Sequence, residues 1–223
     1  MPKPSIAKAV SLINRRGVLL VFPIDNRELP PSLWTEFFPD TKMRWEWDQG
    51  ADTRVSDLWA LMKRLSDCRQ VVYSKWYRSR ATFFSRALFT AMLCLRCIRR
   101  DTRHGLSEAA RRIFEVLENN SPLSTKELKR ATDLQGKLNE TAYSRAMKDL
   151  FNRLLIVGFG EVDDGAFPSL SVGATELLFD DLWRVADEMP ARDAQSSIDR
   201  LMPESSFFRH YFERNLQDRD KGD

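Results

Sequence analysis

The sequence predicts a mainly helical α+β protein with small β-hairpins. Apolar residues recur at helical spacing over several long stretches, as at Ile6, Val10 and Ile13. Short apolar or alternating segments between turn residues predict strands. The 223 residues are 43% hydrophobic and 30% charged, which is enough apolar material for a substantial core and excludes wholesale disorder.

Residues 1–103 are expected to form an N-terminal α+β region. Helical spacing predicts helices over residues 5–16, 33–38, 52–67 and 87–98. Short apolar stretches predict strands over residues 18–22, 43–48 and 71–77. The helix over residues 87–98 is apolar on nearly every face, which is typical of a buried central helix.

Residues 104–174 give the clearest pattern. One apolar stripe predicts a helix over residues 106–119. Ser124-Thr-Lys-Glu127 is a capping box that opens a short second helix. A third helix is expected from about residue 139 to 153, followed by strands over residues 155–162 and 170–172 around the turn Asp163-Asp164-Gly165.

Three helices followed by a hairpin is the order of elements in a winged helix-turn-helix, whose third helix enters the DNA major groove. The sequence therefore predicts a winged helix over residues 104–174. Tandem units, with a second winged helix in the N-terminal region, remain an alternative. Residues 175–223 are expected to form a C-terminal helical segment with an acidic, frayed tail.

The distribution of charge is uneven although the net charge is only +3. Residues 75–153 contain 17 Lys and Arg against 8 Asp and Glu, whereas residues 176–223 contain 7 against 12. A concentrated positive field attracts polyanions such as DNA in a salt-dependent way. The alternative is that these charges only solvate helix faces.

We expect the outward face of the third helix to contact DNA. Arg145 can donate two hydrogen bonds to a guanine edge, and Thr141, Ser144 and Lys148 can reach bases or phosphates. The other expected phosphate contacts are the cations Lys126, Lys129, Arg130, Lys75, Arg78 and Arg80. The acidic pair Asp163 and Asp164 argues against a DNA contact by the wing.

Several stretches resemble the bacterial winged-helix DNA glycosylase family of the AlkZ/YcaQ type, which excises alkylated and crosslinked bases. They are Pro122-Leu-Ser-Thr-Lys-Glu-Leu, Leu150-Phe-Asn-Arg-Leu-Leu-Ile-Val-Gly, Gly165-Ala-Phe-Pro and Thr175-Glu-Leu-Leu-Phe-Asp-Asp-Leu-Trp183. The resemblance is clearest over residues 107–183, and it is closest to the shorter relatives of that family. It implies tandem winged helices around a DNA channel.

The resemblance does not extend to the reaction. Enzymes of that family position a water with a Gln-x-Gln or Gln-x-Asp motif, and none of the five glutamines here has Gln or Asp two residues later. The weak catalytic candidates are Glu46 and Asp48, because a carboxylate between the indoles of Trp45 and Trp47 can have a raised pKa. Strand alternation instead predicts that both carboxylates face water.

The sequence gives little support for a metal site, a nucleotide site or a catalytic triad. The Cys94-x-x-Cys97 pair lacks further ligands for a zinc site, so core cysteines are expected, and neither a phosphate-binding glycine loop nor a catalytic triad is recognisable. We therefore expect no metal, cofactor or nucleotide.

The N-terminus lacks a signal pattern and the longest apolar run, Ala87 to Leu95, is too short for a membrane span, so a cytoplasmic protein is expected.

Three functions remain. The first is a DNA-binding protein of the glycosylase-related family without catalysis. The second is a diverged glycosylase that releases alkylated or crosslinked bases. The third is a protein-interaction scaffold, for which the aromatic stripe Phe207, Phe208, Tyr211, Phe212 and Leu216 is the candidate docking face.

Overall fold

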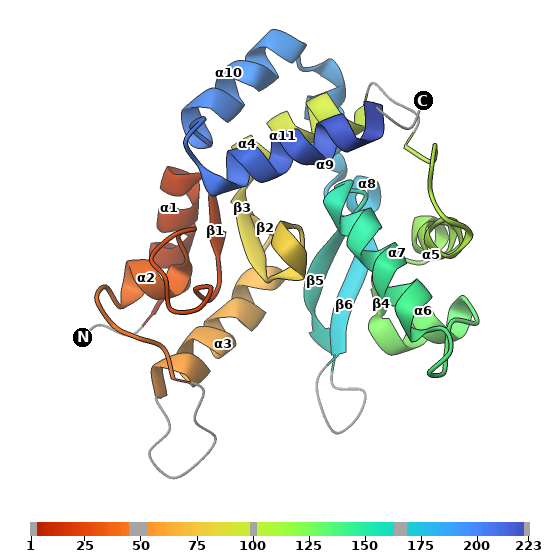
Figure 1. The fold of residues 1–223 in the computed structure, drawn as a ribbon, viewed down its shortest axis with the longest axis horizontal. Coiled ribbons are helices and arrows are strands. Elements are labelled where there is room, and N and C mark those ends of the chain that lie inside the picture. Colours follow the sequence, from red (N-terminus) through yellow and green to blue (C-terminus); the bar gives the residue numbers. More distant parts are fainter. Residues whose placement is uncertain (1–3, 45–52, 99–101, 163–168, 221–223) are drawn as a thin grey trace.

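The computed structural model describes residues 4–44, 53–98, 102–162 and 169–220. The described chain is a mixed α+β structure in which helices surround an antiparallel six-stranded sheet with the order β1-β3-β2-β5-β6-β4 (Figure 1). The expected α+β class is confirmed.

The strands are β1 (Val18–Leu20), β2 (Val71–Ser74), β3 (Thr82–Ser85), β4 (Leu123–Ser124), β5 (Ile156–Val162) and β6 (Ser169–Ala174). The helices of the first half are α1 (Ile6–Arg16), α2 (Leu33–Phe37), α3 (Thr53–Ser66) and α4 (Arg86–Leu93), with the short 3-10 helix η1 (Tyr77–Ser79) and the short π-helix η2 (Cys94–Ile98). Those of the second half are α5 (Glu108–Asn119), α6 (Thr125–Ala131), α7 (Glu140–Asn152), α8 (Thr175–Leu178), α9 (Asp180–Glu188), α10 (Ala191–Leu201) and α11 (Phe207–Asp220).

Two parts of the chain repeat one order of elements, which is helix, edge strand, two helices and a hairpin. The first repeat is α1-β1-α2-α3-β2-β3, and the second is α5-β4-α6-α7-β5-β6. Serines at equivalent positions of the two repeats are the N-caps of equivalent helices. Ser5 and Ser107 cap α1 and α5, and Ser32 and Ser124 each form a capping box at α2 and α6.

The third helix and the following strand of each repeat run in step, 85 residues apart. The buried residues Leu58, Leu61, Met62, Leu65 and Ser66 of α3 correspond to Tyr143, Ala146, Met147, Leu150 and Phe151 of α7. The turn after each helix has a left-handed residue at the matching position, Arg69 with φ 57° and Leu154 with φ 60°. β2 and β5 then begin 85 residues apart. The chain therefore contains an internal structural repeat.

The two repeats meet where β2 pairs with β5. The Cα partners there are Tyr73 and Gly158, which are themselves equivalent residues of the two repeats. A pseudo-two-fold axis therefore passes between them. The ring of Tyr73 occupies the space over Gly158, since a Cβ on that glycine would lie 2.2 Å from Tyr73 Cδ1. Burial of this ring raises the pKa of the Tyr73 hydroxyl above its ordinary value.

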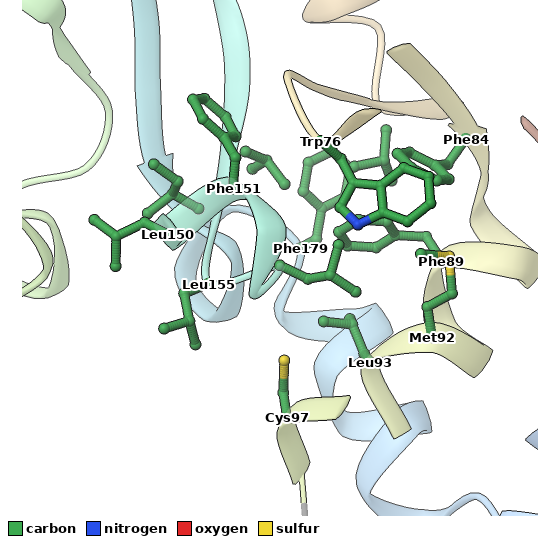
Figure 2. Close-up of a cluster of buried hydrophobic side chains, with 14 of the residues drawn as sticks. Trp76, Phe84, Phe89, Met92, Leu93, Cys97, Leu150, Phe151, Leu155 and Phe179 are labelled. Atoms are coloured by element: carbon green, nitrogen blue, oxygen red, sulfur yellow. The ribbon is translucent and has the colours of Figure 1, made fainter. Parts of the chain in front are cut away.

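The sheet of the first repeat is covered on both faces because its strands alternate between two cores. One core contains Leu19, Val71, Tyr73 and Phe83 together with α1, α2 and α3. The other, larger core contains the alternate residues and extends into the second repeat. Figure 2 shows this larger core at its centre. Trp76, Phe84 and Phe89 come from the first half, Leu150, Phe151 and Leu155 come from the second repeat, and Phe179 lies between them.

The C-terminal helix α11 closes the larger core. Phe208, Tyr211 and Phe212 are buried, and Tyr211 packs edge-on against Trp76 with 5.0 Å between ring centroids. The interpretation of this aromatic stripe as a docking face is therefore wrong for these residues, because the face is already occupied inside the same chain. Within the described stripe, Phe207 remains half-exposed.

The strands of the first half differ from the expected ones at three places. The strand expected over residues 71–77 ends at Ser74, because Trp76 and Tyr77 turn into the larger core through η1. The strand β3 was not expected. The expected strand over residues 43–48 lies outside the described residues from residue 45 onward, and Met43 and Arg44 are not in a strand.

The contact between the repeats predicts a strict size limit at Gly158. The substitution Gly158→Ala should lower the free energy of unfolding by about 1–3 kcal/mol, because the new Cβ overlaps the Tyr73 ring. Urea denaturation measures the loss. In a Tyr73→Val background the same change should cost much less, and an equal loss in both backgrounds would contradict the proposed overlap.

Candidate nucleic-acid interface

The outward face of α7 carries the four residues expected to contact DNA. Helical spacing separates them from the buried side of the helix, so Thr141, Ser144, Arg145 and Lys148 are all exposed. They lie at intervals of three and four residues and therefore form one stripe. The structure brings them together as the sequence predicted.

No carboxylate among the residues that the structure describes pairs with either cation of this stripe. Across the described part of the chain, neither Arg145 nor Lys148 makes an ion pair. The nearest carboxylate along the helix, Asp149, is engaged by Arg153, whose Nε lies 2.8 Å from Asp149 Oδ1. Both cations are therefore available to an external anion.

The cations of α6 differ in their surroundings. Lys129 Nζ lies 2.6 Å from Glu140 Oε2 and 4.8 Å from the centroid of the Tyr143 ring. Lys129 therefore joins α6 to the first turn of α7. Lys126 and Arg130 are exposed on the same helix. Sequence spacing did not distinguish the internally bound lysine from its neighbours.

The segment from Lys75 to Arg80 connects β2 to β3. Its aromatic residues, Trp76 and Tyr77, are at most 2% exposed, so they cannot stack on bases. This burial excludes an aromatic clamp for single-stranded nucleic acid at this segment. Arg78 and Arg80 are exposed, and the short helix η1 that contains Arg78 lies against α7.

Lys75 occupies a different environment from the arginines that follow it. It is partly buried, and this burial lowers the pKa of its amine, while the nearby carboxylate of Glu161 acts in the opposite direction. Glu161 also lies 3.3 Å from Lys63 Nζ of α3. These groups form a polar cluster between the two repeats, so Lys75 is less suited than Arg78 to contact phosphate.

One exposed cation near this face was not expected. Tyr211 donates a hydrogen bond from its hydroxyl to Asn152 Oδ1 at 3.0 Å, which places α11 at the C-terminal end of α7. Arg214 lies over the Tyr211 ring, 5.5 Å from its centroid, and is exposed. The sequence feature that could have indicated Arg214 was its position three residues after Tyr211 on the same helix.

The described structure does not place the remaining candidates on this face. Glu46 and Asp48 lie outside the described residues, as do Asp163 and Asp164 of the hairpin turn. A cavity of about 500 Å³ lies in the first repeat, where Asn26, Glu28 and Trp34 line it. None of the expected DNA-contacting residues lines this cavity.

The cysteines lie in the core. Cys94 and Cys97 are buried, and their thiols donate to the carbonyls of Met189 and Arg153 at 3.2 and 3.0 Å. Over the described ranges, no cluster of three His, Cys, Asp or Glu side chains could hold a metal ion. Over the same ranges, no helix has both the length and the apolar character needed to cross a bilayer.

Comparison with known proteins gives one match. A search of curated proteins and a search of solved structures returned nothing similar. The model of the AlkZ-related family, in contrast, matches residues 4–204, which include both structural repeats, the α7 face and most of the C-terminal helical segment. This match spans most of the sequence, so the chain belongs to the AlkZ-related family.

Proposed function

We propose that this protein binds duplex DNA through its second repeat, acting as a winged helix whose third helix, α7, enters the major groove. The observation that carries the proposal is the stripe on α7, where Arg145 and Lys148 are exposed without a carboxylate partner in the described chain. Membership of a family related to DNA glycosylases supports the same partner.

The residues of the proposed interface would divide into two roles. Arg145 can donate two parallel hydrogen bonds to a guanine, and the hydroxyls of Thr141 and Ser144 can bond to either bases or phosphates. Lys148, Arg130 and Arg78 would neutralise phosphates on either side of the groove. Arg214 extends this set at the C-terminal end of α7.

The described part of the first repeat does not present an equivalent surface on α3. The positions of α3 that correspond to Ser144, Arg145 and Lys148 are Trp59, Ala60 and Lys63. Of these, Lys63 is already paired with Glu161. We therefore infer that α7, and not α3, reads the groove. In this proposal the first repeat serves as a scaffold that supports the second.

A second candidate is a glycosylase that releases damaged bases, and membership of the AlkZ-related family favours it. Its test is the release of a free base from alkylated duplex DNA. If Glu46 supplies the acid or base, Glu46→Gln should abolish that release while leaving DNA affinity intact. Release that survives both Glu46→Gln and Asp48→Asn would exclude these carboxylates.

The DNA-binding proposal predicts a steep salt dependence that depends on α7. Binding of a mixed-sequence duplex, followed by fluorescence anisotropy from low to high salt, should weaken linearly on logarithmic axes. The double variant Arg145→Ala/Lys148→Ala should bind at least tenfold more weakly, and its salt slope should be smaller by about one to two. Absence of binding by the wild-type protein at low salt would overturn the proposal.

A matched pair of lysines tests whether availability, and not charge alone, decides the DNA contact. Lys148→Ala should reduce the salt slope by about one. Lys129→Ala should change the slope less, because Lys129 is already bound to Glu140 and Tyr143. It should instead lower thermal stability slightly. Equal changes in slope from both substitutions would show that the internal ion pair opens on binding.

A further inference from the structure

The turn before α7 contains an apolar side chain that is almost completely exposed. Leu138 has 98% of its surface accessible to solvent, the highest value among the exposed large hydrophobic residues of the described chain. Nearly the whole apolar surface of this side chain lies in water, so a partner that covers it gains the free energy of its burial. Its position directly before α7 makes it accessible to a partner of that helix.

Leu138 has no packing role at the start of its own helix. Asn139 is the N-cap of α7, so Leu138 stands at the position from which an apolar residue often packs onto the fourth helical residue, here Tyr143. That contact is not made, because Tyr143 is 5% exposed beneath Lys129 while Leu138 is in water. The side chain of Leu138 therefore contributes no packing contact to the start of α7.

The surroundings of Leu138 indicate an anionic partner. Leu138 lies three residues before Thr141 and seven before Arg145, which continues the outward stripe of α7 into the turn. Lys137 and Gly136 beside it are exposed, and a Cβ on Gly136 would meet no atom within 4 Å. The carboxylate two residues after Leu138, Glu140, is paired with Lys129, so the sequence neighbours of Leu138 offer exposed cations and hydroxyls that fit DNA better than an apolar protein surface.

We propose that Leu138 contacts the 5-methyl groups of thymine in the major groove and gives the protein a preference for thymine. This inference rests on the proposed function. The N-terminal residues of a groove-reading helix lie nearest the base edges, and the thymine methyl is the apolar group that the major groove presents. Contact with Leu138 removes both groups from water, which accounts for a side chain with no partner in the free protein.

The test removes the apolar groups on each side of the proposed contact, which are the thymine 5-methyl groups of the DNA and the isopropyl group of Leu138. Two duplexes of the same A·T-rich sequence are compared by anisotropy at low salt, one with thymine and one with uracil at every thymine position. The wild-type protein should bind the thymine duplex about fourfold more tightly for each contacted methyl group. Leu138→Ala should bind both duplexes equally, with the affinity of the wild-type protein for the uracil duplex.

Two controls separate the possible failures. Leu177→Ala removes a half-exposed leucine of α8, outside the proposed interface, and should keep the thymine preference. Leu138→Ala should unfold at the wild-type temperature, since the side chain packs against nothing. Equal wild-type affinity for both duplexes, with a steep salt dependence, would overturn the role of Leu138 but not DNA binding. Binding of neither duplex would overturn both.

Discussion

The close approach of Tyr73 to Gly158 is the contact on which the rest of the structure depends. It joins two three-stranded units into one sheet, and it requires a residue without a side chain at one of two equivalent positions. Two tyrosines could not occupy those positions at once, so the repeats had to become different where they meet. The polar cluster of Lys63 and Glu161 then links the same two units beside this contact.

The shared core makes the two repeats one folding unit. Trp76 of the first repeat and Asn152 of the second both contact Tyr211 of α11, so a single helix connects both halves. Arg209 strengthens the attachment of that helix, because it pairs with Asp199 of α10 at 2.8 Å and with Glu213 of its own helix. Figure 1 shows α10 and α11 together at one end of the sheet, next to α4.

The sequence predicted the elements that depend on local signals. Apolar spacing located α5 and α7 closely, and the capping box at Ser124 located the start of α6. The strand β3 escaped prediction because its pairing with β1, where Phe84 lies opposite Val18, joins segments that are far apart in the sequence. The pairing of Tyr73 with Gly158 escaped it for the same reason.

The sequence predicted which residues share the exposed face of α7, but not which of the cations near that face are already paired within the chain. Helical spacing placed Arg145 and Lys148 on one side of α7 correctly. Whether a cation is already occupied depends on the path of the chain between helices, as for Lys129, whose partner Glu140 is eleven residues away. Burial likewise separated Lys75 from Arg78 within one short segment. Both distinctions required three-dimensional contacts.

The unequal surfaces of α3 and α7 determine which kind of DNA sequence the proposed interface would recognise. Dimeric helix-turn-helix proteins present two identical reading helices and so recognise inverted repeats, with half-sites about one helical turn apart. Here the two-fold relation is internal, and only α7 carries unpaired cations at the matching positions within the described chain. In the proposed complex, one helix of one asymmetric chain contacts the DNA, so the recognised sequence need not be palindromic. The orientation of the bound chain then distinguishes the two DNA strands.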